Sequence, residues 1–173
     1  MTEFYVDTTA PVDGDGLSWE TAWNALRPHY NNTDLGAGDH IINCRGGIDE
    51  GVPLGFPSTP TSITLRGDWG GFDVYEDCYR LRGGGYGVAS IGTAGKTLRL
   101  ENIVCESAVG ATASVTGALV SCWGGTLEII NSAFIGNAEA DAGTYYYVVR
   151  AWGAGATVRL YNSTIMFGIT PTT

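Results

Sequence analysis

A short motif that recurs about every 30 residues constrains this chain more than any other feature. The motif alternates apolar and polar residues, ends in asparagine, and occurs at residues 97–102, 126–131 and 157–162. Residues 62–67 form a fainter copy with glycine in the place of asparagine. The distances between the last residues of successive copies are 35, 29 and 31 residues. Recurrence of one strand-rich unit at such a period is the signature of a stacked solenoid.

The alternation predicts which side chains face the interior. Successive side chains of a strand point to opposite faces, so residues two apart should form stacked columns on one face. One inward column should consist of Leu98, Leu127 and Val158, and the next of Leu100, Ile129 and Leu160. The outward positions predict a file of charges in which Glu128 lies between arginines, formed by Arg66, Arg99, Glu128 and Arg159.

The residue that ends each motif predicts a corner. Asparagine tolerates left-handed backbone, and its amide can bond to an identical neighbour above and below. We therefore expect a ladder of Asn102, Asn131 and Asn162. A second corner, rich in glycine, is predicted because residues 120–127 align with 149–158, and residues 87–98 repeat them with Ile91 in the position of the tryptophan.

Composition favours an all-β chain. Glycine accounts for 26 of 173 residues, about twice the average usage of roughly 7 %, and hydrophobic residues still make up 44 %. Many tight turns between strands that bury a core explain both values. We predict a single domain over residues 1–173. It should comprise a cap over 1–39, about four coils over 40–167 with a protruding loop near 67–80, and a tail over 168–173.

The first part of the chain predicts a strand followed by a helix. Residues 3–7 have the composition of a strand, and Ser18 is a good N-cap for a helix. Pro28 should end that helix, because it disfavours helical backbone at the residue before it. The apolar face of the helix would consist of Trp19, Ala22, Trp23 and Leu26. Residues 46–60 are interpreted as an irregular excursion rich in glycine and proline.

Charge and motifs argue against several functional classes. The net charge of −9, with only nine basic residues, argues against a nucleic-acid partner, because phosphate binding needs clustered lysine and arginine. No signal peptide or membrane-spanning run is recognised, so we expect synthesis in a cytoplasm and no membrane partner. The four cysteines lack metal-ligand spacing and are expected as free thiols. The Asp-Gly-Asp-Gly run at 13–16 is interpreted as a turn, so we expect no metal or cofactor.

Carboxylates and aromatic side chains are the candidates for a functional surface. Polysaccharide-cleaving enzymes use paired carboxylates. The candidate acids are Asp68, Asp73, Glu76, Asp77, Glu101, Glu106 and Glu128. They do not form pairs in neighbouring columns, so no catalytic residue is predicted. The aromatic residues exceed what a short column can bury, and exposed aromatics form interfaces or stack on sugars. The interface candidates are Trp69, Phe72, Tyr75, Tyr145 and Tyr146.

The N-terminal residues carry a resemblance to a known superfamily. Residues 4–7, 13–26 and 37–42 read Phe-Tyr-Val-Asp, Asp-Gly-Asp-Gly-Leu-Ser-Trp-Glu-Thr-Ala-Trp-Asn-Ala-Leu and Ala-Gly-Asp-His-Ile-Ile. This series resembles the N-terminal cap of right-handed parallel β-helix proteins, which include pectate-lyase-like enzymes, phage tailspikes and other virion proteins. The resemblance implies a short right-handed parallel β-helix, or solenoid, with a strand–helix cap.

The resemblance and the missing acid pair together suggest a non-enzymatic structural or binding protein of a bacteriophage virion. The expected roles are a capsid decoration (cement) protein or a small fibre or spike component. The last residues are too few to cover the last coil, and an uncovered edge favours a partner. We therefore expect a homo-oligomer, with a trimer favoured, that also contacts virion proteins such as the capsid shell. The alternative is a tailspike-like or lyase-like protein that binds or cleaves a surface polysaccharide.

Overall fold

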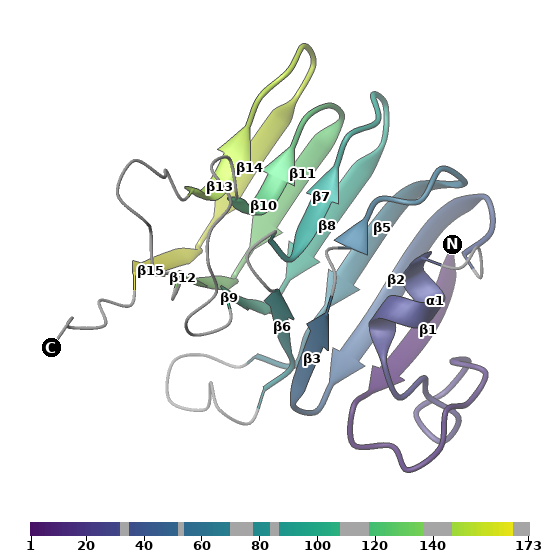
Figure 1. Cartoon of the computed structure of the whole chain (residues 1–173). Coiled ribbons are helices and arrows are strands. Elements are labelled where there is room, and N and C mark those ends of the chain that lie inside the picture. Colours follow the sequence, from purple (N-terminus) through teal and green to yellow (C-terminus); the bar gives the residue numbers. More distant parts are fainter. Residues whose placement is uncertain are drawn as a thin grey trace, which may run out of the picture.

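The computed structural model describes residues 1–31, 35–51, 54–69, 78–83, 87–107, 118–136 and 147–167. These residues form three β-sheets and one short helix (Figure 1). The pairings between strands are parallel throughout this part of the chain. The chain is therefore all-β, as its composition and alternation predict.

Sheet A has six strands in the order β1 (Thr2–Asp7), β2 (Gly38–Arg45), β5 (Pro60–Arg66), β8 (Thr97–Glu101), β11 (Thr126–Ile130) and β14 (Thr157–Tyr161). Sheet B has the order β3 (Ile48–Gly51), β6 (Arg80–Gly83), β9 (Val104–Ser107), β12 (Ala133–Gly136) and β15 (Thr164–Phe167). Sheet C has the order β4 (Leu54–Gly55), β7 (Ala89–Ile91), β10 (Ala118–Cys122) and β13 (Tyr147–Ala151).

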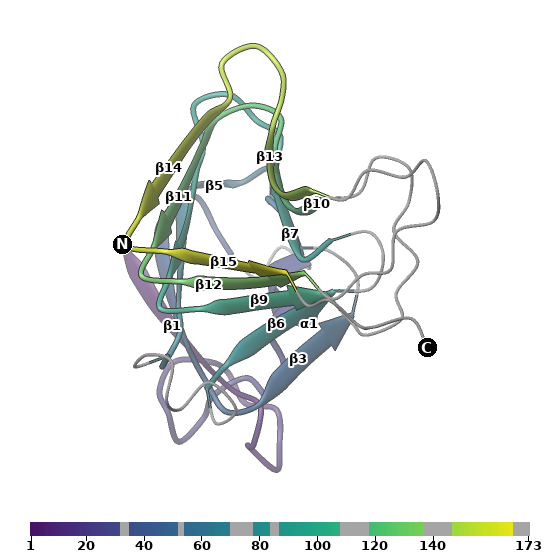
Figure 2. The same ribbon diagram turned by 90° about the vertical axis from the view of Figure 1, so that its left-hand side faces the viewer.

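From β2 onward the chain visits sheets A, B and C in rotation. Each round of three strands therefore stacks on the round before it, from β2–β3–β4 at one end to β14–β15 at the other. Figure 2 shows the three sheets arranged around a common interior. The prediction that residues 46–60 are an irregular excursion is wrong, because they contain β3 and β4. Strands of four and two residues are too short to show an alternating pattern.

The inward columns of sheet A build the core. Leu98, Leu127 and Val158 occupy one register position on β8, β11 and β14. Leu100, Ile129 and Leu160 occupy the next inward position. The members on β8 and β11 are fully buried, and full burial of such a side chain stabilises a fold by about 1.5–3 kcal/mol.

The N-terminal edge of sheet A is covered by the chain itself. Tyr5 donates its backbone N–H to the oxygen of Gly16 and accepts a hydrogen bond from the N–H of Trp23, each at 2.9 Å. Asp7 donates to the oxygen of Trp23 at 2.8 Å. Gly16 has a φ of 73°, and a side chain there would clash with the indole of Trp23. The segment from Gly14 to Trp23 therefore lies beyond β1 as the outermost layer of this end, and we call it the cap segment.

The prediction that a helix begins at Ser18 is wrong. Residues 18–25 form bends, a turn and an isolated parallel bridge between Trp23 and Val6, and the helix α1 spans Leu26–Asn31. The backbone of the cap segment is engaged elsewhere, since Gly14 and Gly16 donate to the oxygens of Ala22 and Thr21 at 3.1 and 2.7 Å. Pro28 lies within the first turn of α1, where proline needs no hydrogen-bond partner for its nitrogen.

A buried carboxylate starts α1. Asp49 Oδ2 on β3 accepts hydrogen bonds from the Leu26 N–H at 2.7 Å and from the Tyr79 hydroxyl at 3.1 Å. Asp49 Oδ1 accepts from Arg27 Nε at 3.2 Å, and both side chains of this ion pair are buried. The carboxylate thus satisfies an N–H that a helix start leaves without an intrahelical partner.

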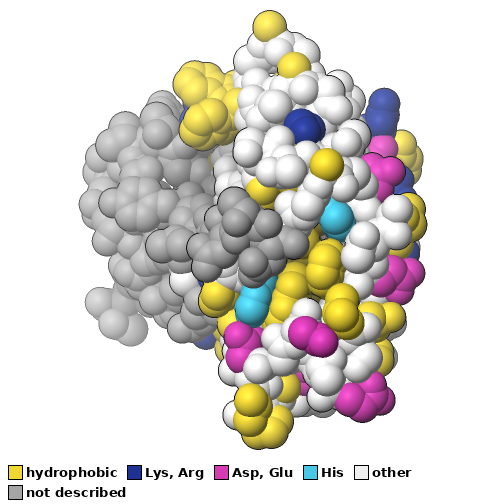
Figure 3. Space-filling model, turned by 90° about the vertical axis from the view of Figure 1, so that its right-hand side faces the viewer, with side chains coloured by type: hydrophobic (Ala, Val, Ile, Leu, Met, Phe, Trp, Pro, Cys, Tyr) yellow, Lys and Arg dark blue, Asp and Glu magenta, His cyan; other side chains and the backbone are white. Residues whose placement is uncertain are grey.

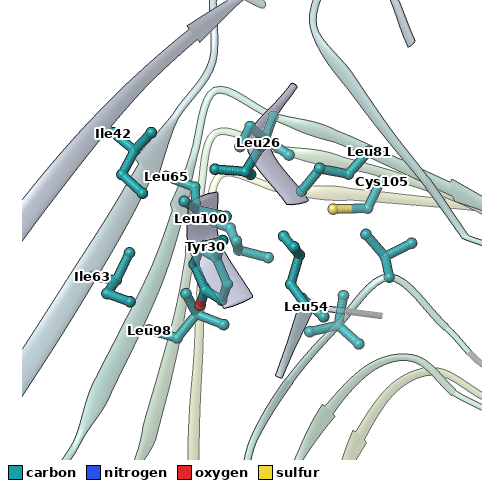
Figure 4. Packing of buried hydrophobic residues seen from close by; sticks show 14 of the residues in the cluster. Leu26, Tyr30, Ile42, Leu54, Ile63, Leu65, Leu81, Leu98, Leu100 and Cys105 are labelled. Atoms are coloured by element: carbon teal, nitrogen blue, oxygen red, sulfur yellow. The ribbon is translucent and has the colours of Figure 1, made fainter. Parts of the chain in front are cut away.

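The helix closes the N-terminal end of the core. Leu26 and Tyr30 are fully buried. In Figure 4 they lie among side chains of the first rounds, including Ile42, Leu54 and Ile63. The cap segment and α1 together cover the first round, so the N-terminal end of the stack, which faces the viewer in Figure 3, is closed. In the described part of the chain, no helix has the length and hydrophobicity needed to cross a membrane.

Candidate interaction surfaces

The asparagine corner is a hydrogen-bonded ladder. Asn102, Asn131 and Asn162 have φ values of 53°, 46° and 45°, which is left-handed backbone. Asn131 donates its side-chain amide to Asn102 at 2.7 Å, and Asn162 donates to Asn131 at 3.1 Å. The ladder fixes one corner of successive rounds in register, which is a structural role.

The outward file of sheet A carries an arginine–glutamate–arginine triad. Glu128 accepts hydrogen bonds from Arg99 Nη2 at 2.6 Å and from Arg159 Nη1 at 2.9 Å. The hydrogen bond from Arg99, together with that from Arg159, lowers the pKa of Glu128. Arg66 does not belong to this file, contrary to the prediction. Arg66 pairs instead with Glu101, at the next outward position of the sheet, and its Nε lies 3.4 Å from the Glu101 carboxylate. The residue of β5 that lies beside Arg99 in the file is Thr64.

The other described acids also have partners. Glu106 is buried on sheet B, 2.6 Å from Arg82 and 3.7 Å from Arg80. Asp68 accepts hydrogen bonds from the backbone N–H groups of Tyr79 at 2.6 Å and Gly46 at 3.4 Å. Asp73, Glu76 and Asp77 lie outside the described residues. The described candidate acids therefore stabilise the fold through ion pairs and backbone contacts.

The predicted interface residues are only partly described. Trp69 is 5 % exposed and packs with Cys78, Val104 and Ala133 in a small cluster on the outer face of sheet B. The prediction that Trp69 is exposed at an interface is therefore wrong, because the side chain is a core residue of this cluster. The remaining candidates, Phe72, Tyr75, Tyr145 and Tyr146, lie outside the described residues.

Two exposed tryptophans lie at the glycine corner and were not among the predicted interface residues. Trp123 and Trp152 are 55 % and 54 % exposed, and their ring centroids are 6.2 Å apart in an edge-to-face arrangement. The guanidinium of Arg150 lies 4.4 Å from the centroid of the Trp152 ring. Cys122 pairs with Ile91, so the residue that corresponds to Trp123 on the neighbouring round is Gly92. The prediction that Ile91 occupies this position is wrong. The recurring Trp-Gly pair in the sequence was the signal for this surface.

Among the described residues, no further strand covers the outer side of the last round. Leu160 is 46 % exposed although it belongs to the same inward column as Ile129, which is fully buried. Tyr161 and Ile165 are also exposed. The strands β13, β14 and β15 are the last strands of their sheets. We call this surface, formed by the outer side of β13, β14 and β15, the open end. It combines apolar side chains with strand edges, both of which favour a partner.

A small cleft lies on the outer face of sheet A near the cap segment. It has a volume of about 260 Å³ and is lined by Trp19, Asn43, Cys44, Arg45, Arg66, Gly67 and Asp68. Arg45 lies 4.2 Å from the centroid of the Trp19 ring and pairs with Asp7 at 2.8 Å. The other arginine of the cleft, Arg66, lies 3.4 Å from the carboxylate of Glu101, so both arginines are engaged by neighbouring acids.

The four cysteines are free thiols in buried positions. They are Cys44, Cys78, Cys105 and Cys122. Burial raises the pKa of Cys78 to about 11 and also raises the pKa of Cys105. A thiol with a raised pKa is neutral and poorly reactive at pH 7. No group of three or more histidine, cysteine or acidic residues that could hold a metal ion occurs in the described ranges.

Comparison with known proteins gives no assignment. The chain matches no model of a protein family, no curated protein and no solved structure. The proposed function therefore rests on the geometry of the chain and on the resemblance of its N-terminal residues.

Proposed function

We propose that the chain is a short right-handed parallel β-helix that serves as a non-enzymatic structural or binding protein of a bacteriophage virion. The proposed role is a capsid decoration (cement) protein or a small fibre or spike component. The protein acts as an oligomer, with a trimer favoured, and contacts other virion proteins such as the capsid shell. The rotation of the chain through three parallel sheets supports the fold, and the resemblance of the N-terminal residues supports the virion assignment.

The observation that carries this proposal is the open end. Leu160 and Ile165 are exposed on the last round, whereas the N-terminal end is closed by the chain's own cap segment and helix. A protein that works alone gains nothing from exposed apolar residues beside unpaired strand edges, and it risks aggregation. An assembly component gains a ready contact surface.

The state of the carboxylates supports a structural role. Glu128 is held between two arginines, Glu101 faces Arg66, and Glu106 is buried beside Arg82. A general acid needs a raised pKa and a general base needs access to substrate. The lowered pKa of Glu128 and the burial of Glu106 favour neither task.

Mass photometry of the purified full chain tests the proposal. We expect species larger than the 18.2 kDa monomer, with a trimer as the favoured oligomer. A chain that stays monomeric, and that binds no virion protein in a cross-linking experiment on assembled particles, contradicts the proposal.

The alternative is a protein that binds or cleaves a surface polysaccharide. The exposed pair of Trp123 and Trp152 favours this alternative, because exposed indole faces also stack on sugar rings. An assay on acidic polysaccharides with the wild type and the Asp73→Asn/Glu76→Gln variant separates the two functions. Cleavage by the wild type that the double variant loses overturns the structural role. We expect no cleavage by either protein.

A further inference from the structure

We draw no further inference here: the strongest candidate, the surface patch of Trp123 and Trp152 at the glycine corner between sheets C and A, leaves both indoles about half exposed, and nothing in the structure shows what covers them.

Discussion

One inward column of side chains runs from the N-terminal end of the stack to the C-terminal end, and its first and last residues differ in burial. At the N-terminal end, Phe4 on β1 is buried against the indole of Trp23, with ring centroids 4.8 Å apart. At the other end, Leu160 occupies the same column on β14 and is nearly half exposed. The apolar alternation of the strands is similar. The difference lies in what the chain places on top.

This contrast shows that a repeated motif specifies the interior of a stack and not its ends. An inward residue is buried only if a further layer covers it, and the described residues supply such a layer at the N-terminal end, with the cap segment and α1. The exposure of Leu160 and Ile165 thus reflects the lack of a further layer among the described residues and not a poor motif. Predictions on matched residues at the two ends can break or sharpen this comparison.

The largest effect is expected from the buried ion pair beneath the helix. Arg27→Met leaves Asp49 buried without its countercharge, and removal of one partner of such a pair costs about 3–5 kcal/mol. Urea unfolding followed by circular dichroism measures the loss. The matched control is Arg159→Met near the open end, where the arginine is exposed and the expected loss is about 0–1 kcal/mol. Equal losses at both sites contradict the distinction between a closed and an open end.

Leucine truncation along one column comes next. Leu100→Ala removes a fully buried side chain, which costs about 2–5 kcal/mol. Leu160→Ala, in the same column, should cost only about 1 kcal/mol in the monomer, because the side chain is already partly exposed. Both values come from chemical unfolding at a protein concentration low enough to prevent association. A loss at Leu160 as large as that at Leu100 indicates that the last round is covered within one chain.

The asparagine corner should give an intermediate effect. Asn131→Ala places an alanine in left-handed backbone and removes two amide hydrogen bonds, for a loss of about 1–3 kcal/mol. Asn131→Gly tolerates the backbone and loses only the amide bonds, so its loss should be smaller. If alanine and glycine cost the same, the backbone conformation is not what selects asparagine at this corner.

The smallest effect is the pH dependence of the triad at Glu128. Unfolded glutamate has a pKa of about 4.3, and the hydrogen bonds from Arg99 and Arg159 lower the pKa of Glu128 in the folded chain. Its contribution to stability is therefore complete above about pH 4.3 and is lost as the pH falls through the lowered pKa. Glu128→Gln should lower the free energy of unfolding at pH 7 by about 0–1 kcal/mol. The variant should also lose less stability than the wild type as the pH falls below about 4.3. Melting temperatures of both proteins from pH 3 to 7 check this prediction. An equal decrease in melting temperature at acidic pH in the wild type and the variant contradicts it.

Much of the stack follows from the sequence, and the reason is local. Alternation fixes which side chains of 97–101, 126–130 and 157–161 share a face, so the columns of Leu98 and Leu100 are predictable. The ladder at Asn131 is predictable because few residues accept left-handed backbone. These features depend on neighbours two residues apart or one motif apart.

The cap could not be predicted in the same way, because contacts distant in the sequence decide it. The apolar spacing from Trp19 to Leu26 favours a helix, yet β1 binds the backbone of Trp23, which prevents one. The real helix starts where Asp49, 23 residues later, accepts the N–H of Leu26. The exposed pair of Trp123 and Trp152 was missed for a related reason. The sequence pattern places the apolar Ile91 in the tryptophan position of this corner, whereas the strand pairing places Gly92 there.

Hydrogen exchange of the backbone amides, measured by mass spectrometry at low and high protein concentration, tests the asymmetry of the two ends most directly. The account predicts slow exchange in β1 at every concentration, because Tyr5 and Asp7 donate to the cap segment. It predicts faster exchange in β14 than in β11 at low concentration, and protection of β14 as copies associate. Protection of β14 equal to that of β11 in the dilute chain contradicts the account, as does exchange in β1 as fast as in β14.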